Sequence, residues 1–87
     1  MNVIKRNGTI QPFDLRKIRR SLANASDEIG RPLNQSDLDH LCAAAEKLCL
    51  AQADPIGHTE IRRIVTRVLE EMGFSYVQQS YNHPAAK

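Results

Sequence analysis

Six cationic side chains gather in the first twenty residues, where Asp14 is the only acidic residue. The rest of the chain carries six basic and nine acidic residues, and the net charge of the whole chain is only +2. The basic excess is therefore local, which is typical of a site for a polyanion. A solvated basic surface is the alternative. The six cations are Lys5, Arg6, Arg16, Lys17, Arg19 and Arg20.

The positions of Arg16 and Lys17 strengthen the case for a bound anion. Asp14 is a suitable N-cap for a helix, and both cations follow it in the first helical turn. Cations there oppose the helix dipole, at about 0.3–1 kcal/mol each. An anion bound at this end would reverse that penalty. The apolar residues of the same segment fall on one stripe, which predicts an amphipathic helix with Leu15, Ile18, Leu22 and Ala25 on its buried side.

A hairpin is expected just before this helix. Asn7-Gly8 favours a two-residue type I′ turn, and its flanks alternate apolar and polar residues. Such a turn would set Lys5 opposite Ile10, which places Lys5, Ile10 and Val3 on one face. We expect Val3 on this face to form an apolar wall for a base and Lys5 to bind phosphate. The other face would carry Ile4, Arg6, Thr9 and Gln11, with Arg6 either clamping phosphate from the rim or solvated.

Three more helices are expected along the chain. The second is capped by Asn34 or Ser36 and runs to about Gln52, and the third opens near Gly57-His58-Thr59 and stops at Gly73. A short fourth helix would carry Phe74, Val77 and Tyr81. We expect residues 1–81 to form one domain and residues 82–87 a flexible tail. The predicted buried positions of the second and third helices are Leu38, Leu41, Cys42, Ala45, Leu48, Cys49, Ile61, Ile64, Val65, Val68, Leu69 and Met72.

The opening of the chain resembles the start of the ATP-cone domain. The resemblance is carried by Val3, Lys5-Arg6-x-Gly8, Phe13 and Lys17-Ile18, and the order of the predicted elements extends it over nearly the whole chain. That module is found at the N-terminus of ribonucleotide reductase large subunits and in the bacterial repressor of their genes. The family usually has Asp where this chain has Asn7, and both residues suit the turn.

The resemblance implies an α+β fold, with a β-hairpin lid that could include a third strand, over a small four-helix bundle. It also implies ATP or dATP as a regulatory ligand, to which Mg²⁺ could come bound. The nucleotide would change the quaternary assembly of a host ribonucleotide reductase, either through its catalytic domain or subunit or through nucleotide-dependent self-association. The implied nucleotide-binding residues are Val3, Lys5, Arg6, Lys17, Ile18, His58, Thr59 and Arg62.

Within this set the implied roles differ. Lys17 would bind the triphosphate, and Ile18 beside it would belong to the core. The family often has a hydroxyl residue where His58 aligns, and Thr59 is adjacent, although an ordinary helix cap is the alternative for Thr59. Arg19 is expected to face solvent.

Composition and length exclude several classes of protein. Eighty-seven residues leave no room for a catalytic barrel or a dinucleotide-binding fold. The sequence has no phosphate-binding glycine loop and no nucleophile-base set, so we predict no catalysis. Cys42 and Cys49 are expected to be buried thiols, too far apart along one helix to bridge, and with the three histidines they provide no metal-ligand spacing. No apolar run reaches the ~20 residues of a membrane span, which favours a cytoplasmic protein.

Two other functions fit the same cations. A nucleic-acid-binding or transcription-regulatory module could use the basic hairpin and first helix on a phosphate backbone. Only four aromatic residues and a net charge of +2 argue against it. A purely structural interaction domain is the third class.

Overall fold

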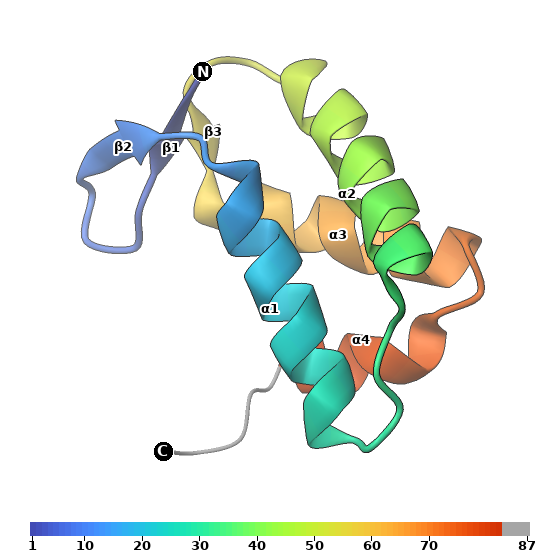
Figure 1. Cartoon of the computed structure of the whole chain (residues 1–87). Helices are drawn as coiled ribbons and strands as arrows, with labels where there is room; N and C mark the ends of the chain where they lie inside the picture. Colours follow the sequence, from blue (N-terminus) through green and yellow to red (C-terminus); the bar gives the residue numbers. More distant parts are fainter. Residues whose placement is uncertain (83–87) are drawn as a thin grey trace.

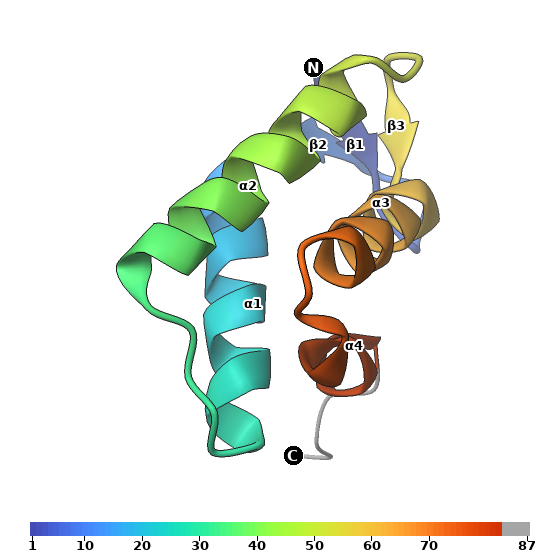
Figure 2. The same cartoon turned by 90° about the vertical axis from the view of Figure 1, so that its right-hand side faces the viewer.

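The computed structural model describes residues 1–82 and has an α+β fold, as predicted. A small sheet stands at one end of four helices (Figure 1). Seen at right angles to that view, α1 and α2 lie on one side and α3 and α4 on the other (Figure 2). The elements are β1 (Asn2–Ile4), β2 (Ile10–Pro12), α1 (Leu15–Glu28), α2 (Gln35–Leu50), β3 (Ile56–Gly57), α3 (His58–Glu71) and α4 (Ser75–Asn82).

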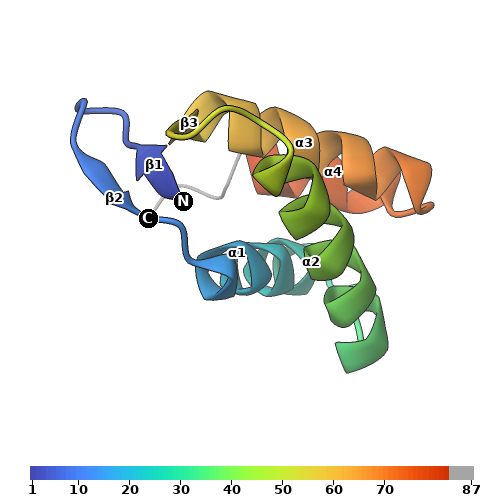
Figure 3. The same ribbon diagram turned by 90° about the horizontal axis from the view of Figure 1, so that it is seen from above.

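The sheet has three strands in the order β2-β1-β3, so the third strand is present. β1 is antiparallel to β2 and parallel to β3, and Val3 pairs with Gln11 on one side and with Ile56 on the other. Since β3 leads directly into α3, the sheet fixes the start of α3 beside the hairpin. From above, the hairpin projects to one side of the helices (Figure 3).

The hairpin turn differs from the predicted type I′ turn. Within the turn only Gly8 has a positive φ, of 86°, whereas Asn7 does not. The Gly8 N–H donates to Lys5 O (2.9 Å) and the Lys5 N–H donates to Thr9 O (2.8 Å). This is a three-residue loop built on a type I turn followed by a left-handed glycine. The Asn7 side chain stabilises it by accepting from the Thr9 N–H and hydroxyl, at 3.1 and 2.7 Å.

The longer loop shifts the strand register by one residue and corrects the predicted faces. Ile10 pairs with Ile4, and both are exposed on the face opposite Val3. Gln11, which was expected on the face opposite Val3, instead pairs with Val3. A one-residue shift exchanges the two faces of a strand, which is why both residues change sides together.

The helices follow the predicted stripes closely. Ile18, Leu22 and Ala25 of α1 are buried, as are both cysteines, which are free thiols. Asp14 caps α1 and Asn34 caps α2, each accepting from a backbone N–H two or three residues on. α2 ends at Leu50, before the expected Gln52.

Two details near the end of the fold differ from expectation. Met72, predicted to be buried, is 39% exposed because α3 ends there and the chain turns at Gly73. Gly73 has φ of 85°, and the Phe74 N–H donates to Leu69 O (2.8 Å), closing the helix end. Asn82, expected in the tail, is the last residue of α4, and its amide donates to the Thr66 hydroxyl (3.1 Å). The remaining expected tail, residues 83–87, lies outside the described residues.

None of the helices in residues 1–82 is long and apolar enough to cross a membrane.

Candidate functional site

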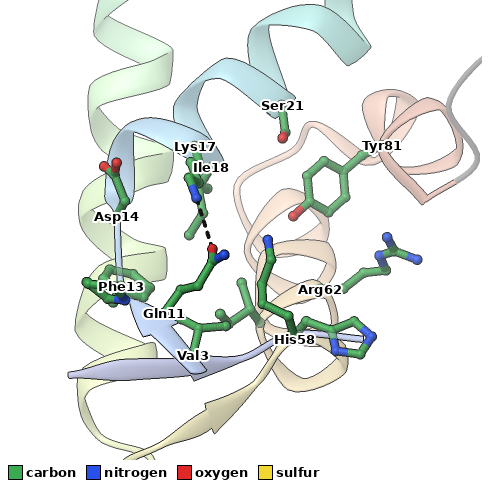
Figure 4. A pocket seen from close by; sticks show the side chains of 13 residues that line it. Val3, Gln11, Phe13, Asp14, Lys17, Ile18, Ser21, His58, Arg62 and Tyr81 are labelled. Atoms are coloured by element: carbon green, nitrogen blue, oxygen red, sulfur yellow. Dashed lines mark hydrogen bonds between the residues drawn. The ribbon is translucent and has the colours of Figure 1, made fainter. Parts of the chain in front are cut away.

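A cleft of about 230 Å³ lies between the hairpin, the first turns of α1, the start of α3 and the end of α4. Figure 4 shows Gln11, Lys17, Ser21 and Tyr81 around one space, with His58 and Arg62 of α3 at its side. The strand pairing β1-β3 is what brings the hairpin beside α3, and the Asp14 cap sets the direction in which α1 leaves β2. The lining residues are Val3, Lys5, Gln11, Pro12, Phe13, Asp14, Lys17, Ile18, Ser21, His58, Ile61, Arg62 and Tyr81.

Six of the eight residues expected to bind nucleotide line this cleft. They come from three separate parts of the chain, and they are Val3, Lys5, Lys17, Ile18, His58 and Arg62. Ile18 is almost wholly buried, at 7% exposure, so its contribution is to the cleft floor and the core.

Arg6 and Thr59 do not line the cleft. Arg6 lies in the exposed hairpin loop, next to a shallow depression formed by that loop. Thr59 is not the cap of α3, because Gly57 holds that position and no side chain caps the helix. The Thr59 hydroxyl instead lies 3.4 Å from His58 Nε2.

Several lining residues were not anticipated as site residues. Gln11 was predicted on the face away from the cleft, because the predicted strand register was one residue off. Ser21 follows Lys17 by four residues on α1, and this spacing places both on one helix face, which could have identified Ser21 as a site residue.

Tyr81 was expected only as an apolar residue of α4, but its hydroxyl is directed into the cleft (Figure 4). Burial raises the pKa of Tyr81, so the hydroxyl stays protonated and can donate a hydrogen bond.

The cleft is electropositive. Lys5, Lys17 and Arg62 line it, and within residues 1–82 no carboxylate forms an ion pair with any of the three. Among residues 1–82, the only acidic residue in the lining is Asp14, which accepts from Arg16 Nε (3.1 Å) and from the Arg16 backbone N–H (3.0 Å). These hydrogen bonds lower the pKa of Asp14 and satisfy its charge locally.

Lys17 meets Gln11 at the mouth of the cleft. Its Nζ donates to Gln11 Oε1 at 3.4 Å, as the dashed line in Figure 4 marks. Lys17 is otherwise exposed, and the first turn of α1 contains no acidic residue. The ammonium group is thus held near the cleft by a long contact to a neutral amide, which an anion can replace.

Arg19 was predicted to face solvent, but in the structure it contacts α2. Its Nη1 lies 2.6 Å from Asp39 Oδ1, and its Nη2 donates to Gln35 Oε1, so it ties α1 to α2. The hydrogen bond to Asp39 raises the pKa of Arg19. Arg19 therefore serves the packing of the two helices, away from the cleft lining.

Residues 1–82 contain no cluster of three or more His, Cys, Asp or Glu side chains that could hold a metal ion.

The family of the chain is shown by comparison with protein-family models. The model of the ATP cone domain matches residues 1–83. The chain belongs to the ATP-cone family. A search of curated proteins found no match. ATP-cone domains bind ATP or dATP as regulatory ligands, so this ATP-cone domain is a nucleotide-sensing regulatory module and is not itself catalytic.

Proposed function

We propose that the cleft binds ATP and dATP and that this ATP-cone domain regulates a host ribonucleotide reductase by changing its quaternary structure. The observation that supports the binding site is that Lys5, Lys17 and Arg62, from three elements, line one cleft in which Asp14, the one acidic residue of its described lining, is already paired with Arg16. A triphosphate is the part of a nucleotide that such a set of cations would recognise.

The cleft also offers a place for the base. Val3, Phe13 and Ile61 supply apolar surface between the hairpin and α3, and all three are only partly exposed. We assign the base to this wall, with Val3 against it, and the phosphates to Lys5, Lys17 and Arg62. The volume of about 230 Å³ is below the ~300–1,000 Å³ of typical ligand pockets. A nucleotide would therefore extend through the open mouth, where Mg²⁺ could accompany the phosphates.

Regulation requires that the nucleotide bind two assembly states differently. A ligand shifts an equilibrium only by its difference in affinity for the two states. We propose a ribonucleotide reductase catalytic domain or subunit as the partner, acting in the cytoplasm, with self-association of the domain as a second route to the same control. Static light scattering with and without dATP tests the second route, and an unchanged mass would confine regulation to the host.

Calorimetric titration of the chain with ATP, dATP and GTP tests the binding. We expect ATP and dATP to bind in the micromolar range, roughly −8 kcal/mol, and GTP to bind more weakly. An isotherm that stays flat to millimolar nucleotide would overturn the proposal.

Duplex DNA is the control ligand for the nucleic-acid alternative. Arg16 and Arg19 are engaged by Asp14 and Asp39, which leaves fewer of the six N-terminal cations for a phosphate backbone. We therefore expect weak DNA binding. Submicromolar binding at physiological salt, falling steeply as salt rises, would favour the alternative.

A further inference from the structure

The last turn of α4 is bound to two other helices by side-chain hydrogen bonds. The Ser80 hydroxyl donates to Glu28 Oε2 of α1 (2.8 Å), and Asn82 Nδ2 donates to the Thr66 hydroxyl of α3 (3.1 Å). Tyr81 stands between these two residues in sequence, and its hydroxyl is directed into the cleft (Figure 4). Three successive residues thus contact α1, the cleft and α3.

These contacts carry weight because α4 is short. It has eight residues, and isolated helices of fewer than ~12–15 residues are marginal in water. Within residues 75–82 only Val77 is fully buried, one turn before Tyr81, which is partly buried against the core. The position of the last turn therefore depends on the Tyr81 ring and on the hydrogen bonds of Ser80 and Asn82.

Packing alone does not determine where the Tyr81 hydroxyl lies. Tyr81 and Arg62 line the cleft and also an adjacent cavity of about 210 Å³ beside α1 and the end of α4. The ring therefore borders two open spaces, and a small shift of the last turn would withdraw the hydroxyl from the cleft. Burial raises the pKa of Tyr81, and the charge of Arg62 partly offsets this rise. The hydroxyl is thus a neutral donor near the Arg62 guanidinium.

We propose that the Asn82–Thr66 pair, together with the Ser80–Glu28 contact, positions the Tyr81 hydroxyl to donate to a phosphate oxygen of the bound nucleotide. This inference rests on the proposed function, which assigns Arg62 to the phosphates. A hydroxyl beside that cation donates to the same anion, as a charge-assisted hydrogen bond. In the described lining of the cleft and of the adjacent cavity, neither Thr66 nor Asn82 is present, so both act on the ligand through Tyr81 and are positioning residues.

Two substitutions of Thr66 test this by calorimetry of the whole chain with ATP. Thr66→Val removes the hydroxyl that binds Asn82 and is close in shape to threonine, whereas Thr66→Ser keeps the hydroxyl. We expect Thr66→Val to weaken ATP binding about three- to tenfold and Thr66→Ser to restore affinity to within about twofold of the wild type.

Gln78→Ala is the matched control for the docking of α4 on α3. Gln78 Nε2 donates to Glu70 Oε1 (2.7 Å), so it joins the same two helices one turn before Asn82. Gln78→Ala should leave ATP affinity unchanged. A loss of affinity equal to that of Thr66→Val would mean that ATP binding depends on the general docking of α4, and it would overturn the specific role of the Asn82–Thr66 pair.

A double-mutant cycle with Tyr81→Phe separates positioning from a purely structural role. If Thr66 acts through the Tyr81 hydroxyl, Thr66→Val weakens ATP binding in the wild type and causes no further loss in Tyr81→Phe. Equal losses in both backgrounds, or no loss in either, would overturn the inference and leave the proposed function standing. No binding heat with the wild type would overturn both. Should Thr66→Val fail to fold, Asn82→Ala removes the other member of the pair and takes its place in the cycle.

Discussion

Lys17 Nζ lies 3.4 Å from Gln11 Oε1, so the first turn of α1 and strand β2 meet at the mouth of the cleft. The two residues are six apart in sequence, and the Asp14 cap between them sets the bend. A neutral amide at this distance is a weak partner for an ammonium group. The pair therefore positions Lys17 beside the cleft and leaves it available for a phosphate.

Lys17→Ala should weaken ATP binding roughly ten- to hundredfold. The change removes one charge-assisted contact to phosphate, which is worth about 1.5–3 kcal/mol. The free domain should be as stable as the wild type or slightly more so, because a cation in the first turn opposes the helix dipole. Calorimetry gives the first quantity and urea unfolding the second.

Arg20→Ala is the matched control for Lys17→Ala. Arg20 lies three residues further along α1, is exposed and does not line the cleft. We expect it to reduce ATP affinity only by the loss of general electrostatic attraction. If both substitutions weaken ATP to the same extent, the cations form a diffuse basic surface and the cleft has no specific phosphate site.

Arg19→Ala should lower stability while leaving ATP affinity nearly unchanged. The guanidinium joins α1 to Asp39 and Gln35 of α2, and the contact is partly exposed, so the loss should be modest. A double-mutant cycle with Asp39→Ala measures the coupling in the urea unfolding midpoint. Strictly additive midpoints would show that the ion pair contributes nothing to the packing of the two helices.

The helical part of the fold was predictable because its signals are local. Asp14 and Asn34 act as caps through their own side chains, and Gly73 ends α3 because a left-handed residue is needed there. Periodic apolar residues then identified nearly all of the core. Leu15, Leu48 and Ile61 were also predicted to be buried and are only partly buried against that core. Met72 is exposed, since periodicity alone does not reveal that the last residue of a stripe lies where the helix ends.

The hairpin register was not predictable from Asn7-Gly8. The same dipeptide suits a two-residue turn or the last two positions of a three-residue loop. The hydrogen bonds from Thr9 to the Asn7 side chain favour the second. The register decides which residues of β2 face the cleft, so the wrong register excluded Gln11 from the predicted site. Val3 and Lys5 lie on β1 and the loop after it, and both line the cleft as predicted.

Arg19 shows why charge alone could not distinguish the N-terminal cations that line the cleft from those that bind other parts of the fold. The partner of Arg19, Asp39, is twenty residues away and belongs to another helix, so no local pattern signals the pair. In the same way Tyr81 joins the cleft only because α4 packs against α1 and α3. These are tertiary contacts, and they decide which cations and hydroxyls are available to a ligand.

Ser26→Ala should destabilise the domain by about 1 kcal/mol, because it leaves the partly buried Leu33 N–H without its protein partner. Ser26 is fully buried, its hydroxyl donates to Ala23 O (2.9 Å), and it accepts from the Leu33 N–H (3.2 Å). The bond to Leu33 holds the loop between α1 and α2. Urea unfolding measures the loss, and calorimetry should show ATP affinity unchanged. A variant as stable as the wild type would mean that water satisfies the Leu33 N–H.

Tyr81→Phe should weaken ATP binding about tenfold, by removing a neutral hydroxyl that donates to the ligand. The ring and its packing remain, so the unfolding midpoint should change little. Tyr76→Phe is the matched control, because Tyr76 lies on the same helix outside the cleft lining. If the two variants bind ATP equally well, the Tyr81 hydroxyl takes no part in binding.

Asp14→Asn should remove one component of the acid sensitivity of the domain. Hydrogen bonds from the Arg16 side chain and backbone lower the pKa of Asp14 in the folded state, below its unfolded value of about 3.9. A carboxylate of this kind stabilises the fold above the unfolded pKa, and the contribution is lost as pH falls through the folded pKa. Asparagine is also a good cap, so the variant keeps the cap and loses the carboxylate's charged contact with Arg16 and its attraction to Lys17. Urea midpoints of the two proteins should differ by a constant amount from pH 7 to 5 and converge below about pH 4. Comparing the two curves removes the effect of the other carboxylates. If the difference in urea midpoint between the wild type and Asp14→Asn is the same at pH 3 as at pH 7, the ionised form of Asp14 does not stabilise the fold.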